Sequence, residues 1–158
     1  EALQEGLAVF AEYLVGGLSR PRLRLLAGRV VAAQGLVAGA SFVDTWRLLT
    51  SVHGFERKTA FTVAMRIHRG GGLTKDALYL KGLIEVLAFF SKGGSLHPLL
   101  LGKYATEHVP IIRELDWRGV LRDPPLSPRY LDLPHVASRL ESARDGLTVL
   151  DLFRGKRK

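Results

Sequence analysis

Two glutamates lie among apolar residues near the start of the chain. Residues 3–14 have the periodicity of a helix, in which Glu5 and Glu12 fall on one side and Leu7 and Phe10 on another. A carboxylate beside such an apolar stretch needs a partner, which water, a basic residue or a metal ion could provide. From the residue types, a solvated glutamate on the helix surface is the ordinary interpretation, and metal ligation is the one that would carry chemistry.

The segment Gln4-Glu5-Gly6-Leu7-Ala8 resembles the signature of the QEGLA-motif family of zinc carboxypeptidases. That family includes the tubulin-type tyrosine carboxypeptidases, and some bacterial members are named flavohemoglobin expression-modulating QEGLA-motif proteins. The same helix is similar to the third-ligand helix of gluzincin metallopeptidases. The resemblance continues through residues 66–80, which read RIHRGGGLTKDALYL, and spans roughly the first two thirds of the chain.

The resemblance implies a Zn²⁺ site in which Glu5 is the third protein ligand, after two histidines on an earlier helix. Such a site leaves a coordination position for water and lowers the pKa of that water to about 7. The implied reaction is attack of this water on the last peptide bond of a polypeptide substrate. Glu12 would orient a zinc-bound histidine, and an ion pair with Arg20 or Arg24 is the equally weighted alternative. Gly6 would let another backbone or the metal site approach the helix.

The sequence also departs from the family, because it contains no H-E-x-x-x-H motif. Its histidines are at positions 53, 68, 97, 108 and 135, and no two of them are paired with a glutamate at ligand spacing. We therefore expect the C-terminal part of a longer protein, whose missing N-terminal part supplies the histidines and the general base. The full-length protein would be a zinc metallocarboxypeptidase and this part would be inactive. The alternative is a non-catalytic helical module that modulates expression or binds a protein.

Arg69 and Lys75 flank a run of glycines that has the chemistry of an anion site. Glycines permit unusual backbone angles, and a helix N-terminus donates N–H groups. The spacing is not that of a phosphate-binding P-loop. We expect this site to bind the terminal carboxylate of the substrate, with Arg69 able to bind it bidentately. A plain linker with solvated charges is the alternative. Tyr79, on the next helix, could stabilise an oxyanion or be a half-buried core residue.

Composition narrows the class of protein. The chain has 158 residues, 47% hydrophobic and 24% charged, which is typical of one globular domain. It has no cysteine, which excludes disulfides and thiolate zinc sites and is compatible with the cytoplasm, where we expect the protein. No apolar run reaches the roughly 18–20 residues that span a bilayer. Its net charge is +8, but the basic residues are scattered, so we do not expect nucleic-acid binding.

Glycines and prolines divide the chain into helices, which predicts a mainly α-helical fold, the helical C-terminal portion of a gluzincin-like metallopeptidase domain. Residues 1–158 form a single helical part, with a family-like core over 1–120 and a proline-rich loop and basic tail over 121–158. The expected helices cover 1–15, 21–37, from a cap at Ser41 to about 53, 57–68, from Thr74 to the glycines at 93 and 94, 99–103, 108–117 and 134–142. A small strand is expected at 148–152. The expected core aromatic residues are Trp46, Phe55, Phe61, Phe89 and Phe90.

Overall fold

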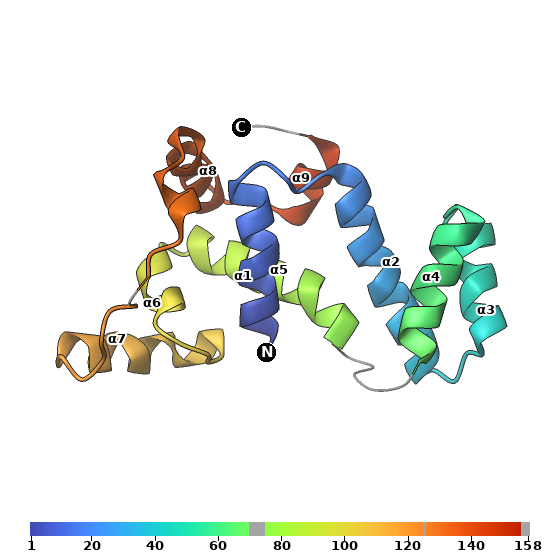
Figure 1. Cartoon of the computed structure of the whole chain (residues 1–158), viewed down its shortest axis with the longest axis horizontal. Coiled ribbons are helices and arrows are strands. Elements are labelled where there is room, and N and C mark those ends of the chain that lie inside the picture. Colours follow the sequence, from blue (N-terminus) through green and yellow to red (C-terminus); the bar gives the residue numbers. More distant parts are fainter. Residues whose placement is uncertain (70–74, 125, 156–158) are drawn as a thin grey trace. The chain divides into compact units, whose positions relative to one another are not determined.

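The computed structural model describes residues 1–69, 75–124 and 126–155. Throughout these residues the chain forms helices joined by turns, and none of them lies in a β-strand (Figure 1). The mainly α-helical class predicted from the sequence is therefore confirmed. Within the described ranges, no helix combines the length and the apolar character that crossing a membrane requires.

The chain divides into two compact units. The first comprises residues 1–20 and 81–158, and the second comprises residues 21–80. Helix α5, Lys75–Ser91, begins in the second unit and continues into the first, and α2, Arg20–Val37, starts at the last residue of the first segment. Each unit has buried apolar residues of its own.

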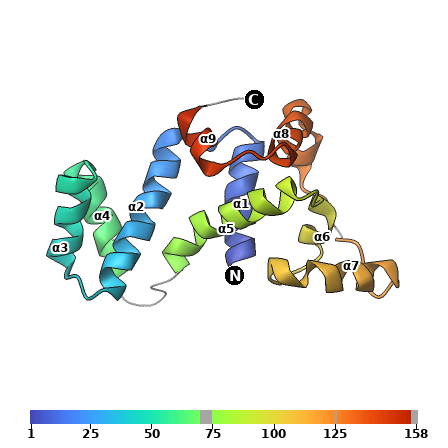
Figure 2. The same cartoon turned by 180° about the vertical axis from the view of Figure 1, so that it is seen from behind.

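The first unit is built around the crossing of α1, Ala2–Leu14, and the later part of α5 (Figures 1 and 2). Phe10 of α1 stacks on Phe90 of α5, with ring centroids 5.0 Å apart, and both side chains are buried. The remaining elements of this unit are α6 (Leu96–Leu100), the 3₁₀ turn Thr106–His108, α7 (Val109–Trp117), the 3₁₀ turn Arg129–Asp132, α8 (Pro134–Arg144) and α9 (Val149–Arg154).

The second unit contains α2, α3 (Phe42–Arg47), a π-helical turn at Leu48–Val52, α4 (Arg57–His68) and the start of α5. Small and branched aliphatic side chains make its core: Ala32, Ala33, Leu49, Ala60, Val63 and Ile67. Thr45 is buried there, and its Oγ1 lies 2.9 Å from Nε2 of His68, which joins α3 to the end of α4.

Several local predictions are confirmed. The helix predicted over 57–68 has those bounds. Ser41 and Asp44 form the predicted capping box, in which Asp44 N–H donates to Ser41 Oγ at 3.2 Å and Ser41 N–H donates to Asp44 Oδ2 at 3.1 Å. Phe90 is in the core, as expected. The predicted cap at Thr74 and the glycines at 70–72 lie outside the described residues.

Three local predictions are wrong. The helix expected over 99–103 lies at Leu96–Leu100, and residues 101–103 are not helical. Residues 149–154 form helix α9 instead of a strand, because Thr148 and Asp151 make a second capping box. The apolar residues near position 150 therefore belong to a short capped helix. Phe61 is 51% exposed and is not a core residue, because it lies on the outer side of α4 and contacts Phe42 edge to face.

Candidate functional site

Glu5 lies in the first half of α1 and is half-buried. Leu3, Val9, Phe10 and Leu14 of the same helix are buried, so the apolar face of α1 is fixed against the rest of the first unit. Gln4 adds a further constraint, because its Nε2 donates a hydrogen bond to the carbonyl oxygen of Gly102 at 3.1 Å. The helix that carries Glu5 is thus held in one position by packing and by a polar contact beside it.

Gly6, the residue after Glu5, fits against the backbone of α5. A Cβ added to Gly6 would lie 2.2 Å from the carbonyl carbon of Gly82, and a Cβ added to Gly82 would lie 2.0 Å from the carbonyl oxygen of Ala2. The sequence left open whether the glycine admits another backbone or a metal site. The neighbour that the structure places against it is a backbone.

The residues that the structure describes do not by themselves form a zinc site. No group of three or more His, Cys, Asp or Glu side chains within them could hold a metal ion. Nε2 of the exposed His97 lies 3.3 Å from Oδ2 of Asp116 and 3.9 Å from Oδ1 of Asp123, which are ion-pair contacts. Glu5 is one carboxylate, and a catalytic zinc needs three protein ligands. No catalytic step through a metal therefore follows from these residues alone.

Glu12 is half-buried in the last turn of α1, where its carbonyl oxygen accepts hydrogen bonds from the N–H groups of Gly17 and Leu18. Of the two arginines considered for its side chain, Arg24 donates to the carbonyl oxygens of His53 and Gly54, at 2.6 and 2.9 Å. Arg20 lies over the ring of Phe153. The role of Glu12 beside a zinc-bound histidine remains a prediction.

The two predicted carboxylate-binding cations flank the segment 70–74, which lies outside the described residues. Arg69 follows the last residue of α4 and is exposed, and its N–H donates to the carbonyl oxygen of Met65 at 3.0 Å. Lys75 is the first residue of α5 and is also exposed. Both cations belong to the second unit, whereas Glu5 and Glu12 belong to the first.

Tyr79 is half-buried on α5, and its ring centroid lies 5.9 Å from the guanidinium carbon of Arg29 on α2. This distance is at the outer limit of a cation–π contact. Tyr79 therefore lies near a cationic group, and its role in stabilising an oxyanion remains a prediction.

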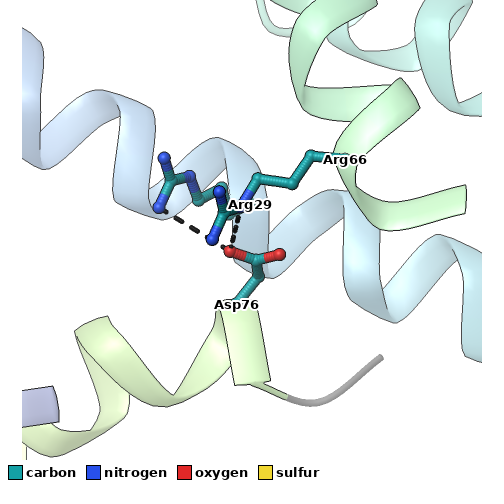
Figure 3. Close-up of polar contacts among 3 residues, drawn as sticks. All are labelled: Arg29, Arg66 and Asp76. Carbon is teal, nitrogen blue, oxygen red and sulfur yellow. Dashed lines mark hydrogen bonds and ion pairs between the residues drawn. The ribbon is translucent and has the colours of Figure 1, made fainter. Parts of the chain in front are cut away.

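A three-residue ionic cluster was not predicted from the sequence (Figure 3). Asp76 of α5 is buried, and its Oδ1 accepts a hydrogen bond from Nε of Arg66 at 2.6 Å. The same oxygen lies 3.6 Å from Nη1 of Arg29. The carboxylate raises the pKa of Arg66 through the hydrogen bond. Burial and the charge of Arg66 lower the pKa of Arg29, and Asp76 opposes this effect.

The sequence holds two signals for this cluster. Arg29 interrupts an apolar stretch of residues 25–33, which is the same kind of signal that marks Glu5. Arg66 and Asp76 stand on either side of a short connection between two helices, where opposite charges can meet. From the sequence, Asp76 is a favourable charge at a helix N-terminus, and the structure shows that it also pairs two arginines from different helices.

Comparison with known proteins identifies a family. The model of a family described as microtubule-associated tyrosine carboxypeptidase matches residues 1–147. This range includes the Q-E-G-L-A helix and extends through α8. No curated protein and no solved structure matches the chain.

Proposed function

Because the chain belongs to the microtubule-associated tyrosine carboxypeptidase family, we propose that it is part of a zinc-dependent carboxypeptidase that acts on the C-terminus of a polypeptide. The observation that carries this proposal is the extent of the family match, which covers residues 1–147. Within this range, Gln4-Glu5-Gly6-Leu7-Ala8 lies on a helix that is packed through buried side chains and a glycine contact. The family motif thus occupies a well-defined structural position.

In this proposal Glu5 is a zinc ligand, and the two histidine ligands and the general base belong to a part of the protein that this sequence does not contain. Two observations support this assignment of the zinc ligands to two parts of the protein. The sequence has no H-E-x-x-x-H motif, and the described residues contain no group of side chains that could hold a metal. Zinc, when bound, would supply a Lewis acid and an activated water. The 158-residue chain would be inactive without the missing ligands.

We assign the binding of the substrate's terminal carboxylate to Arg69 and Lys75. Both side chains are exposed, and Lys75 begins α5, whose first turn presents backbone N–H groups. An exposed arginine directly after α4 and an exposed lysine at the start of α5 both carry a positive charge that suits a carboxylate. Tyr79, one turn further along α5, is assigned to stabilisation of the oxyanion. Glu12 is assigned to orienting a histidine ligand.

Metal binding provides the first test. Isothermal titration of Zn²⁺ into this chain should give no stoichiometric, submicromolar binding, because one carboxylate cannot replace three ligands. Tight stoichiometric binding would show that the chain contains a complete site and would contradict the assignment of the missing histidines.

Activity provides the second test, in a protein that carries both this chain and an H-E-x-x-x-H helix. That protein should release the C-terminal residue of a peptide, and Glu5→Ala should remove both the zinc and the activity. Glu114→Ala is the matched control, because Glu114 is an exposed carboxylate paired with Arg118. A full zinc content in Glu5→Ala would exclude Glu5 as a ligand. If the wild-type protein binds zinc and releases no residue, the non-catalytic helical module is the better description.

A further inference from the structure

A small groove lies between α2 and α4 of the second unit. Its volume is about 240 Å³, which is less than the roughly 300–1,000 Å³ of pockets that hold drug-sized ligands. Its walls are formed by Leu25, Arg29, Lys58, Thr59, Thr62, Val63 and Arg66. A groove of this size suits a small ion or a single charged group of a larger ligand.

The groove is strongly cationic. Arg29 comes from α2, and Lys58 and Arg66 come from α4, whereas none of the described residues that line it has a carboxylate. The carboxylate nearest to these cations in the described ion pairs is Asp76, whose Oδ1 lies 2.6 Å from Arg66 and 3.6 Å from Arg29. Three positive charges against this one negative charge leave an excess of two. The lowered pKa of Arg29 reflects the same crowding, because burial, Arg66 and Arg22 all lower it.

One N–H donor of this cluster makes no hydrogen bond within the described residues. Nε of Arg29 is buried and has no hydrogen-bond partner in the described structure. Arg66 uses Nε for Asp76, and its side chain is 47% exposed to solvent. Figure 3 shows both guanidinium groups beside the Asp76 carboxylate. Both arginines contact the same oxygen of Asp76. The negative charge of this carboxylate reduces the repulsion between the two guanidinium groups.

We propose that this groove binds a small dianionic oxyanion of the phosphate class, between Arg29, Lys58 and Arg66. A dianion would compensate the excess of two charges, whereas a monocarboxylate would leave one uncompensated. Guanidinium groups offer pairs of N–H donors that match two oxygens of such an ion. Thr59 adds a hydroxyl group to the lining of the groove. This proposal does not depend on the peptidase function, because none of the residues that line the groove is assigned a role in that function.

Nuclear magnetic resonance can test this proposal on the whole chain. Inorganic phosphate, sulfate and acetate should each be titrated at matched ionic strength, while the backbone N–H signal of Thr59 and the Nε–H signal of Arg29 are followed. Phosphate and sulfate should give saturable shifts at both positions. Acetate should bind at least about tenfold more weakly, which corresponds to the loss of one charge-assisted hydrogen bond. Equal affinity for acetate would overturn the dianion assignment.

The Lys58→Gln variant distinguishes anion binding in the groove from nonspecific attraction of anions to the positively charged protein. Lys58 is exposed, so its replacement should leave the fold intact, and it should weaken sulfate binding roughly tenfold. Lys92→Gln is the matched control, because Lys92 is an exposed lysine in the first unit, and it should leave sulfate affinity unchanged. Absence of saturable sulfate binding by wild type, or an equal loss in both variants, would overturn the proposal.

Discussion

Gly6 of α1 and Gly82 of α5 pack backbone against backbone, although 75 residues separate them in the sequence. There is no room for a methyl group on either side of this contact. Glycine has no Cβ, which is why two helices can approach so closely here. The glycine of the Q-E-G-L-A motif therefore has a structural role, because it determines how near the helix that carries Glu5 lies to α5.

Gly6→Ala should lower the free energy of unfolding by about 1–3 kcal/mol, as expected when a methyl group is forced into a packed interface. The matched control is Gly102→Ala, because a Cβ at Gly102 would meet no atom within 4 Å and its φ is not in the left-handed region. Urea denaturation followed by circular dichroism measures both variants. Equal stability of the two variants would contradict the close contact between α1 and α5.

Arg139→Lys should destabilise the end of α1. Nη1 of Arg139 donates to the carbonyl oxygens of Tyr13 and Leu14 at the end of the helix, at 2.8 and 2.9 Å, and the Tyr13 oxygen also accepts from the Gly16 N–H at 3.0 Å. Lysine keeps the charge, but its side chain is one bond shorter than that of arginine and does not reach the position of Nη1, so we expect a loss of about 1–3 kcal/mol in stability. Arg144→Lys, at an exposed position on α8, is the control. The expectation fails if thermal melts show no difference between the two variants.

The start of α3 should respond to acid. Hydrogen bonds from the Ser41 hydroxyl and the Ser41 backbone N–H lower the pKa of Asp44 below its ordinary value of 3.8. A lowered pKa means that the carboxylate contributes stability above pH 3.8, and that this contribution is lost as the pH falls through the lower pKa of the folded protein. Titration of the Asp44 carboxyl carbon by nuclear magnetic resonance should give a midpoint below 3.8, and Ser41→Ala should raise it. A midpoint that Ser41→Ala leaves unchanged would contradict the capping box.

In the zinc-loaded peptidase, Arg69→Ala should reduce the preference for a free C-terminus over an amidated one. Loss of a charge-assisted hydrogen bond costs about 1.5–3 kcal/mol, or roughly tenfold or more in kcat/KM for the free acid. Zinc content should stay unchanged. Arg47→Ala is the control, since Arg47 is also an exposed arginine at the end of a helix. If Arg69→Ala discriminates as strongly as wild type, Arg69 does not bind the carboxylate.

Tyr79→Phe should lower kcat in the same assay, because an oxyanion would lose a hydrogen-bond donor. The matched control is Tyr130→Phe, because Tyr130 is similarly half-buried and burial raises the pKa of its hydroxyl group. Unchanged turnover in Tyr79→Phe would identify Tyr79 as a packing residue beside Arg29.

Helix positions and the family could be predicted from the sequence, because their signals are local. The capping box at Ser41 depends on residues three apart, and the bounds of α4 follow from its flanking loop residues. The motif from Gln4 to Ala8 indicated the family that the match over residues 1–147 confirms. The wrong strand prediction at residues 148–152 has a local cause too, because Thr148 and Asp151 form a capping box that starts a helix there.

Only the tertiary structure could decide which distant groups meet. The contact of Gly6 with Gly82 depends on how two helices cross, and the pairing of Asp76 with both Arg29 and Arg66 depends on three helices converging. The exposure of Phe61 depends on which side of α4 faces the core. Hydrogen bonding within a turn is fixed by neighbours in the chain, whereas burial and charge pairing depend on residues brought together by packing. The sequence therefore determined the helices and the family, and the fold decided the surroundings of each candidate site residue.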